Sequence, residues 1–245
     1  MNKRKILLLA STLLMVAVLA VGGTLAYFQD DDSITNVFTV GYVEIDLDEN
    51  FEQGSELMPS TGKDEEGNVK NAVEKEVFVT NTGKNDAYVR VHIAIPHILD
   101  NGNPSFDAGE NVLHFNYAPD SVGADKWDWS TTTGAPYEGT FNYYETTIAG
   151  IAYNVYVVTY EKALVKDETT ANAMHQVYLD ARVTNQDIID INEVLGKDNW
   201  QILVVAEGVQ AEGFANAYEA LNTAFGAPGS YAITWPYQPA EGEQE

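Results

Sequence analysis

The four histidines are the residues of this chain best suited to catalysis or metal binding, and their spacing fits no zinc peptidase. Such an enzyme places two histidines one helical turn apart with a glutamate beside the first, as in HExxH. Here His92, His97, His114 and His175 begin the segments HIAIP, HILDN, HFNYA and HQVYL. His92 and His97 have opposite parity along a strand, and Pro96 lies between them. We predict no histidine metal site, with His92 on the solvent face of a strand and His175 at a strand start near the core.

Oxygen ligands for a hard cation such as calcium occur together in the segment DNGNPSFDAGEN, residues 100–111. The spacing differs from that of an EF-hand, because Gly102 and Pro104 stand where ligands should be. Turns rich in Asn and Asp also form without any ion. The sequence therefore leaves open a calcium site or a plain turn, and it predicts no other cofactor. The candidate calcium ligands are Asp100, Asn103, Asp107 and Glu110.

The sequence contains none of the common motifs for nucleophilic catalysis or phosphate binding. There is no GxSxG or P-loop pattern, and the absence of cysteine excludes a thiol nucleophile, a thiolate metal site and a disulfide. Trp127 and Trp129 would share one face of a strand, where they could stack against sugar rings or pack in the core. We therefore expect a protein without enzymatic activity. A carbohydrate-binding module that uses these tryptophans is an alternative.

The amino terminus predicts export. Three basic residues at positions 3–5 precede ILLLASTLLMVAVLAV, whose sixteen residues are fewer than the ~20 that a bilayer requires. A basic start, an apolar middle and small residues near the end are typical of a secretory signal peptide. We predict a signal peptide over residues 1–26, cleaved beside Ala26 and Tyr27. An uncleaved membrane anchor is the alternative.

The protein that remains after this cleavage is strongly acidic. It has ten basic residues against thirty-seven acidic ones, a net charge of −27. Such a surface repels nucleic acid and anionic lipid, so nucleic acid is not an expected partner and membrane contact is expected only during export. The charge also opposes self-association, which salt or calcium should therefore favour.

Most of the remaining chain predicts β-strands. In YVRVHIAI, residues 88–95, apolar and polar residues alternate and Pro96 follows, which is typical of a half-buried strand. EVFVT, residues 76–80, precedes it across a turn, so the two are predicted to form a hairpin. Further strands are predicted for HQVYLDARVT, IAYNVYVVTY and ILVVA, the last of them buried on both faces.

The elements together predict an all-β fold. The phase of ITNVFTVGYVEIDL flips at Gly41, which indicates a bulge or a handover between two sheets. In residues 214–226, apolar side chains recur at steps of four, three and four, as in a helix. We predict an antiparallel jelly-roll-type β-sandwich with one or two short helices over residues 27–238. A disordered acidic tail is expected over residues 239–245.

The opening segment GGTLAYFQDDDSITNVFTVGYVEIDL resembles the signal and first strand of the TasA/camelysin family, secreted proteins of Gram-positive bacteria that are processed by a SipW-type signal peptidase. LMPS, VFVTNTGKNDAYVRV and AEGVQAEGFANAYEALNTAFG resemble further segments of the family. Tyr27 departs from it, because relatives often have a small residue there. The resemblance implies a SipW-dependent jelly-roll subunit of extracellular biofilm matrix fibres or of a cell-surface layer. Its implied partners are further copies, related matrix proteins and the peptidase during export. Camelysin-type members imply a secreted metallopeptidase as a further alternative.

Cleavage would expose a new amino-terminal segment, YFQDDDSITNVFTV, with apolar residues at both ends. We predict that this segment is donated as a strand to the open edge of the next subunit, which would give filaments rather than closed dimers. The alternative is that the strand pairs within its own domain. The residues expected to act in assembly are Phe28, Val37, Phe38 and Val40.

Overall fold

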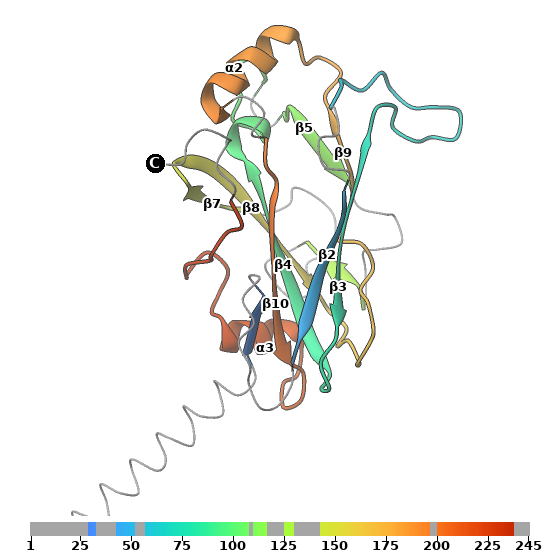
Figure 1. Cartoon of the computed structure of the whole chain (residues 1–245), viewed down its shortest axis with the longest axis vertical. Coiled ribbons are helices and arrows are strands. Elements are labelled where there is room, and N and C mark those ends of the chain that lie inside the picture. The colour runs from blue at the N-terminus through green and yellow to red at the C-terminus, as the bar shows by residue number, and fades with distance from the viewer. Residues whose placement is uncertain are drawn as a thin grey trace, which may run out of the picture.

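The computed structural model of the chain describes residues 29–32, 43–51, 57–107, 110–116, 125–129, 143–196 and 200–237. Two antiparallel sheets pack face to face in this part of the chain (Figure 1). The predicted signal peptide and acidic tail lie outside the described residues, so these two predictions stay predictions.

One sheet has six strands in the order β1-β10-β4-β8-β6, with β7 also paired to β8. Its strands are β1 (Gln29–Asp32), β4 (Ala87–Pro96), β6 (Trp127–Asp128), β7 (Tyr143–Ile148), β8 (Ile151–Tyr160) and β10 (Leu203–Gln210). The other sheet has the order β2-β3-β9-β5. Its strands are β2 (Ile45–Phe51), β3 (Val73–Asn81), β5 (Leu113–Asn116) and β9 (Met174–Leu179). A 3-10 turn, η1 (His97–Leu99), and two helices, α2 (Asn185–Leu195) and α3 (Ala217–Ala224), complete the described elements. The predicted antiparallel sandwich with short helices is confirmed.

The chain crosses repeatedly from one sheet to the other, and the predicted hairpin is therefore wrong. β3 pairs with β2 and β9, whereas β4 pairs with β10 and β8 in the facing sheet. The apolar sides of β3 and β4 pack against each other across the core instead of standing side by side. Asn81 stabilises the crossing turn, because its side-chain amide donates to the carbonyls of Asn85 at 2.9 Å and Leu164 at 2.8 Å and its side-chain oxygen accepts from the Gly83 amide. A local turn pattern cannot distinguish such a crossing from a hairpin.

The chain also passes from one sheet to the other near its start. β1 belongs to the six-stranded sheet and β2 to the four-stranded one, so the chain passes between sheets across the segment that contains Gly41. The sheet membership of β1 and β2 agrees with the predicted handover, but Gly41 lies outside the described residues, so the choice between a bulge and a handover there stays a prediction. Val43 and Ile45 are buried where β2 begins.

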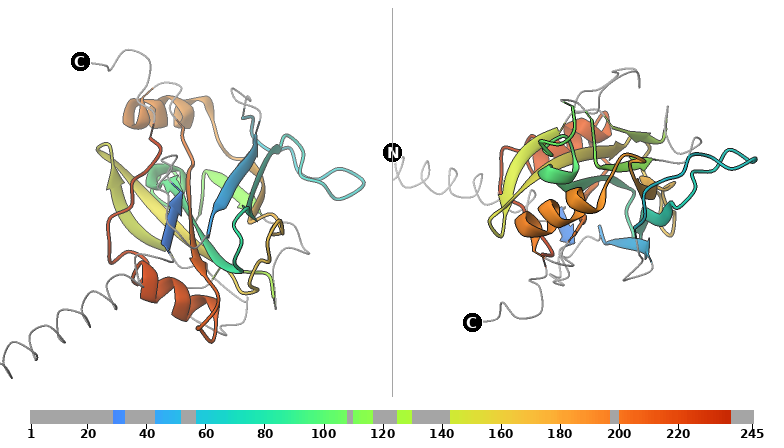
Figure 2. Two further views of the ribbon diagram at one scale, coloured as in Figure 1. Left: turned by 60° about the horizontal axis from the view of Figure 1, so that its bottom comes forward. Right: turned by 90° about the horizontal axis from the view of Figure 1, so that it is seen from above.

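Two helices close opposite ends of the sandwich (Figures 1 and 2). The helix predicted over residues 214–226 is confirmed as α3, which Asn216 caps by accepting from the Glu219 amide at 2.9 Å. The sequence pattern did not predict α2, and the predicted strand runs to Thr184, whereas β9 ends at Leu179. A capping box formed by Thr184 and Asp187 starts α2 at this point.

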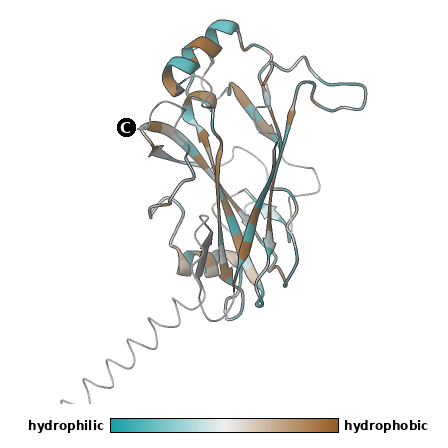
Figure 3. Cartoon of the chain, viewed as in Figure 1, coloured by the Kyte–Doolittle hydropathy of each residue, from teal (hydrophilic) through white to brown (hydrophobic). Residues whose placement is uncertain are grey.

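The outer face of the six-stranded sheet is covered, which the alternating pattern of β4 did not predict. Nine of the ten residues of β4 are buried, including Arg90 and His92 on its polar side. Much of β4 and β10 is brown in Figure 3, the colour of hydrophobic residues. α3 covers one part of this face through Ala217, Ala220 and Leu221 on Val209. The C-terminal segment covers another part, where Trp235 and Tyr237 pack on a patch formed by Ala94, Ile148, Tyr153, Val155 and Leu203.

Candidate functional site

The first strand of the described chain is an edge strand of the six-stranded sheet. β1 pairs antiparallel with β10 in the register Gln29 with Val209, Asp30 with Gly208, Asp31 with Glu207 and Asp32 with Ala206. β10 is otherwise bonded to β4, so β1 covers what would be the open edge of the sheet. Backbone groups on such an edge form a ready template for another strand. The described part of the predicted assembly segment, β1, thus pairs with a strand of its own chain.

The acceptor strand β10 is buried along its full length and closely approached from the other sheet. A Cβ atom at Gly208 would lie 2.8 Å from the Cγ2 atom of Ile45, a distance that real Cβ contacts essentially never show. Glycine is therefore required for β2 to pack beneath this part of β10. The inner side of the edge is closed by Ile45, and the outer side carries the side chain of Glu207.

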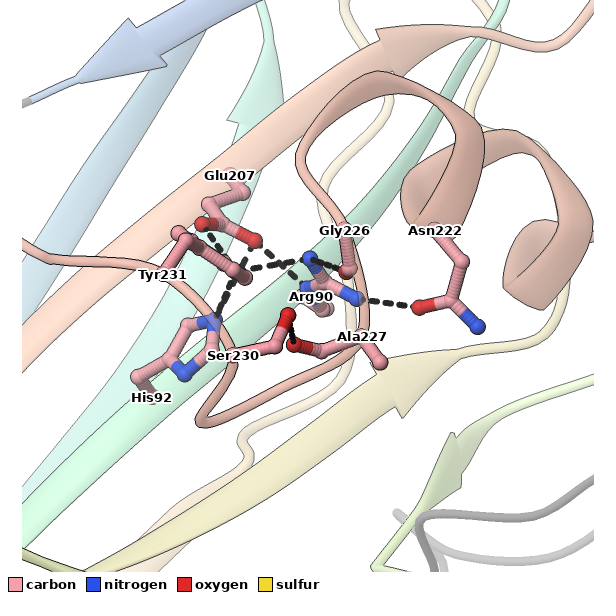
Figure 4. A network of polar contacts seen from close by, with 8 residues as sticks. All are labelled: Arg90, His92, Glu207, Asn222, Gly226, Ala227, Ser230 and Tyr231. Atoms are coloured by element: carbon pink, nitrogen blue, oxygen red, sulfur yellow. Dashed lines mark hydrogen bonds and ion pairs between the residues drawn. The ribbon is translucent and has the colours of Figure 1, made fainter.

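Glu207 is the centre of a buried polar network on the outer face of the sheet (Figure 4). Arg90 Nε donates to Glu207 Oε2 at 2.5 Å, and His92 Nε2 lies 3.1 Å from the same oxygen. The Tyr231 hydroxyl donates to Glu207 Oε1 at 2.6 Å. Burial alone raises the pKa of Glu207, but the hydrogen bond from His92 and the charges of His92 and Arg90 outweigh it and lower the pKa below its ordinary value. The carboxylate is thus held in its ionised form.

Arg90 connects this carboxylate to the C-terminal part of the chain. It donates through Nη1 to Asn222 Oδ1 at 2.9 Å, and through Nη2 to the Gly226 carbonyl at 3.1 Å and the Tyr231 hydroxyl at 2.7 Å (Figure 4). The guanidinium therefore joins β4, β10, α3 and the segment that follows α3. The prediction that His92 faces solvent is wrong, because its side chain is 0% exposed beneath this cover.

The candidate calcium ligands form hydrogen bonds with neighbouring protein groups. Asp100 is buried, and its carboxylate accepts from Asn154, Tyr156 and Asn111 at 2.7–2.8 Å. Asn103 Oδ1 accepts from the Ser105 amide at 2.8 Å, which is a plain Asx turn.

The other two candidate ligands lie apart from that carboxylate's hydrogen bonds. The Asp107 carbonyl accepts from the Glu110 amide at 3.0 Å, and Glu110 forms an ion pair with Arg182. In the described part of the chain, no three His, Asp or Glu side chains gather into a group that could hold a metal.

The remaining histidines lie in three separate surroundings. His97 Nδ1 is 2.9 Å from Asn154 Oδ1, and His114 Nε2 is 2.8 Å from Asp180 Oδ2. His175 lies at the start of β9 as predicted, but Met174 occupies the core and the His175 side chain is 40% exposed.

The tryptophan pair lies in the core. Trp127 contacts Tyr160 edge to face, and Trp129 stacks on Phe115 with ring centroids 5.5 Å apart. Their exposed fractions are 0% and 2%, so they offer no platform for a sugar ring. The alternative that these residues pack in the core is confirmed.

The other residues predicted for processing and assembly lie outside the described part of the chain. They are Ala26, Tyr27, Phe28, Val37, Phe38 and Val40.

None of the helices in the described part has the length and apolar content that crossing a bilayer requires. Comparison of the sequence with models of protein families and with curated proteins finds no match.

Proposed function

We propose that the chain is a secreted structural protein, a TasA-like subunit that assembles into extracellular matrix fibres or a surface layer. The observation that carries the proposal is the position of β1 (Gln29–Asp32). This four-residue strand lies close to the predicted start of the mature chain and at the edge of a sheet, where it is bonded to β10. The export signal and the resemblance of the opening segment support the same conclusion.

Assembly would use the pairing that β1 makes within one chain. If β1 leaves its own β10 and pairs with β10 of the next copy, the same backbone groups are satisfied and the edge stays closed. Each copy then donates one strand and accepts another, and this head-to-tail contact generates a filament. Residues 33–44, which separate β1 from β2, give the strand the length of chain needed to reach outward.

A pair of engineered cysteines tests this exchange, because the chain has none of its own. Gln29 and Val209 are directly opposite in the register, and opposite residues of antiparallel strands lie about 4.5–5.5 Å apart, within the range a disulfide spans. We expect mature protein with Gln29→Cys and Val209→Cys, assembled and then oxidised, to give a ladder of crosslinked oligomers on a non-reducing gel. The same variant oxidised as a dilute monomer should instead crosslink within one chain and then fail to form fibres.

Two controls complete the design. The single variant Gln29→Cys should give at most crosslinked dimers, since one cysteine cannot extend a chain. Deletion of residues 27–35 should leave a folded monomer that forms no fibres in salt or calcium by electron microscopy. Fibres from the deletion variant, or fibres whose disulfides are all within one chain, would contradict strand donation. Chelator-sensitive cleavage of casein by the purified protein would favour the peptidase alternative.

A further inference from the structure

The first and the last segments that the structure describes meet on β10. The backbone of Glu207 pairs with Asp31 of β1, and its carboxylate accepts a hydrogen bond from Tyr231 near the C-terminus. We call residues 226–237 the C-terminal strap; it runs back from α3 across the sheet toward β7 (Figure 1). A single residue therefore contacts the N-terminal strand through its backbone and the C-terminal strap through its side chain.

Side chains of the strap attach it to the sheet at two places, in addition to the bond from Arg90 to the Gly226 carbonyl where the strap begins. Residues 232–237 have no regular secondary structure. Trp235 and Tyr237 pack on the apolar patch described above. Tyr231 provides the polar attachment, because its hydroxyl donates to Glu207 Oε1 at 2.6 Å and accepts from Arg90 Nη2 at 2.7 Å (Figure 4). Segments held in this way open more readily than the central strands of a sheet.

Opening of the strap would change the surroundings of β10. Glu207 is 2% exposed, and its Oε2 atom is shared by Arg90 and His92, while Oε1 accepts from Tyr231. Loss of Tyr231 removes a hydrogen bond from a buried ionised group, and that group then needs water or a shift of the backbone to be solvated. Entry of water and a backbone shift would both affect Glu207, whose backbone pairs with β1.

We propose that the C-terminal strap is a latch for the N-terminal strand. When Tyr231 contacts Glu207, β10 retains β1; when the strap lifts, β1 leaves β10 more often and the edge becomes available to a second copy. The consequence for assembly rests on the proposed function, whereas the coupling between strap and strand is a property of the single chain. The two can therefore be tested separately.

The variant Tyr231→Phe, made in the full mature chain, tests the coupling because it removes the hydroxyl and keeps the ring. In a dilute monomer we expect amide hydrogen exchange to accelerate about 10- to 100-fold in peptides covering residues 29–32 and 206–209, the range expected for a lost hydrogen bond to a buried charge. Exchange in β3 and β9 should not change. The matched control is Tyr237→Phe, which removes a hydroxyl from the same strap at a residue that packs on the apolar patch, and it should leave β1 protected.

A second variant reaches the strap without altering the polar network. Trp235→Ala removes the apolar attachment, so exchange should rise in the strap and also in β1. Acceleration confined to the strap in either variant would overturn the proposal. If Tyr231→Phe raised exchange in β3 and β9 as well, the variant would be globally destabilised, and Trp235→Ala would decide the matter. The two proposals can also fail separately. If the engineered disulfides form only within one chain while Tyr231→Phe accelerates exchange in β1, the coupling between strap and strand is supported and assembly by strand donation is refuted.

Discussion

Two buried carboxylates in this protein have opposite surroundings. Glu207 lies on the outer face of the six-stranded sheet, and Asp100 follows η1 beside β8; they are 2% and 1% exposed. Cationic Arg90, together with His92 and Tyr231, surrounds Glu207. The partners of Asp100 are two amides and a phenol. Accordingly the pKa of Glu207 is lowered, whereas burial raises the pKa of Asp100 despite its hydrogen bonds and the opposing charges of His97 and His114.

The difference shows what each network is suited to do. A charged pair depends on both of its members, because removal of one leaves the other uncompensated in the interior. When the donors around a carboxylate are neutral, removal of one of them leaves no uncompensated cation, and the carboxyl group can be protonated without losing its other hydrogen bonds. The Glu207 network joins segments from both halves of the chain, including the C-terminal strap. The Asp100 network instead attaches a surface loop to the adjacent strand β8.

The largest effect is expected from breaking the charged pair. Arg90→Met keeps much of the side-chain volume but leaves Glu207 buried without its cation, so we expect a loss of about 3–5 kcal/mol in the free energy of unfolding. Urea denaturation at neutral pH measures it. The matched control is Arg182→Met, because Arg182 is half exposed in its ion pairs with Glu110 and Asp180 and its loss should cost much less than that of Arg90. Equal losses in the two variants would mean that the buried network has no special role.

A smaller effect is expected at Asp100. Asp100→Asn removes a buried charge whose hydrogen-bond partners are neutral, and the new amide group retains one acceptor oxygen for Tyr156 and Asn154. Its other end presents a donor to Asn111, so one hydrogen bond is lost unless that side chain turns over. We expect a loss of about 1–2 kcal/mol in the same denaturation experiment. A loss as large as that of Arg90→Met would remove the distinction between the two networks.

The sequence predicted individual elements better than their partners. The strand β8 was predicted from its β-branched and tyrosine-rich composition and the helix α3 from its periodicity, and both are present. The pairing of β3 and β4 was predicted wrongly, because adjacency in the sequence favours a hairpin while packing across the core decides the sheet. α2 was missed although Thr184 and Asp187 have the spacing of a capping box.

The buried network could not be predicted from β4 alone. Arg90 and His92 alternate with apolar residues as they would on a solvent-exposed face, and the segment that covers them comes from the other end of the chain. A signal was present in β10, where Glu207 interrupts the apolar run LVVA that precedes it. A carboxylate in a strand buried on both faces requires a partner, and two cationic candidates on another strand were available in the sequence.

The smallest effect is expected in the pH dependence of stability, where the two carboxylates act in opposite directions. A lowered pKa means that the contribution of Glu207 is present above its ordinary pKa of 4.5 and is lost as the pH falls through the lower value of the folded state. A raised pKa means that the contribution of Asp100 is fully present below its ordinary pKa of 3.8 and is lost as the pH rises through the folded value. Acidification therefore weakens one network while it relieves the other.

Removing one carboxylate or the other should change the loss of free energy of unfolding on acidification in opposite directions. We compare the free energy of unfolding at about pH 5.5 with that at about pH 3.5 within each variant, so that differences in absolute stability cancel. Glu207→Gln should lose less stability on acidification than the parent protein, because its titrating group is gone. Asp100→Asn should lose more, because the group that offsets the loss is gone. Each change should be smaller than the losses expected above, because only the part of the titration between these two pH values contributes to it. Parallel curves for the three proteins would show that neither carboxylate titrates differently in the folded state, and the contrast between cationic and neutral surroundings would then have no energetic consequence.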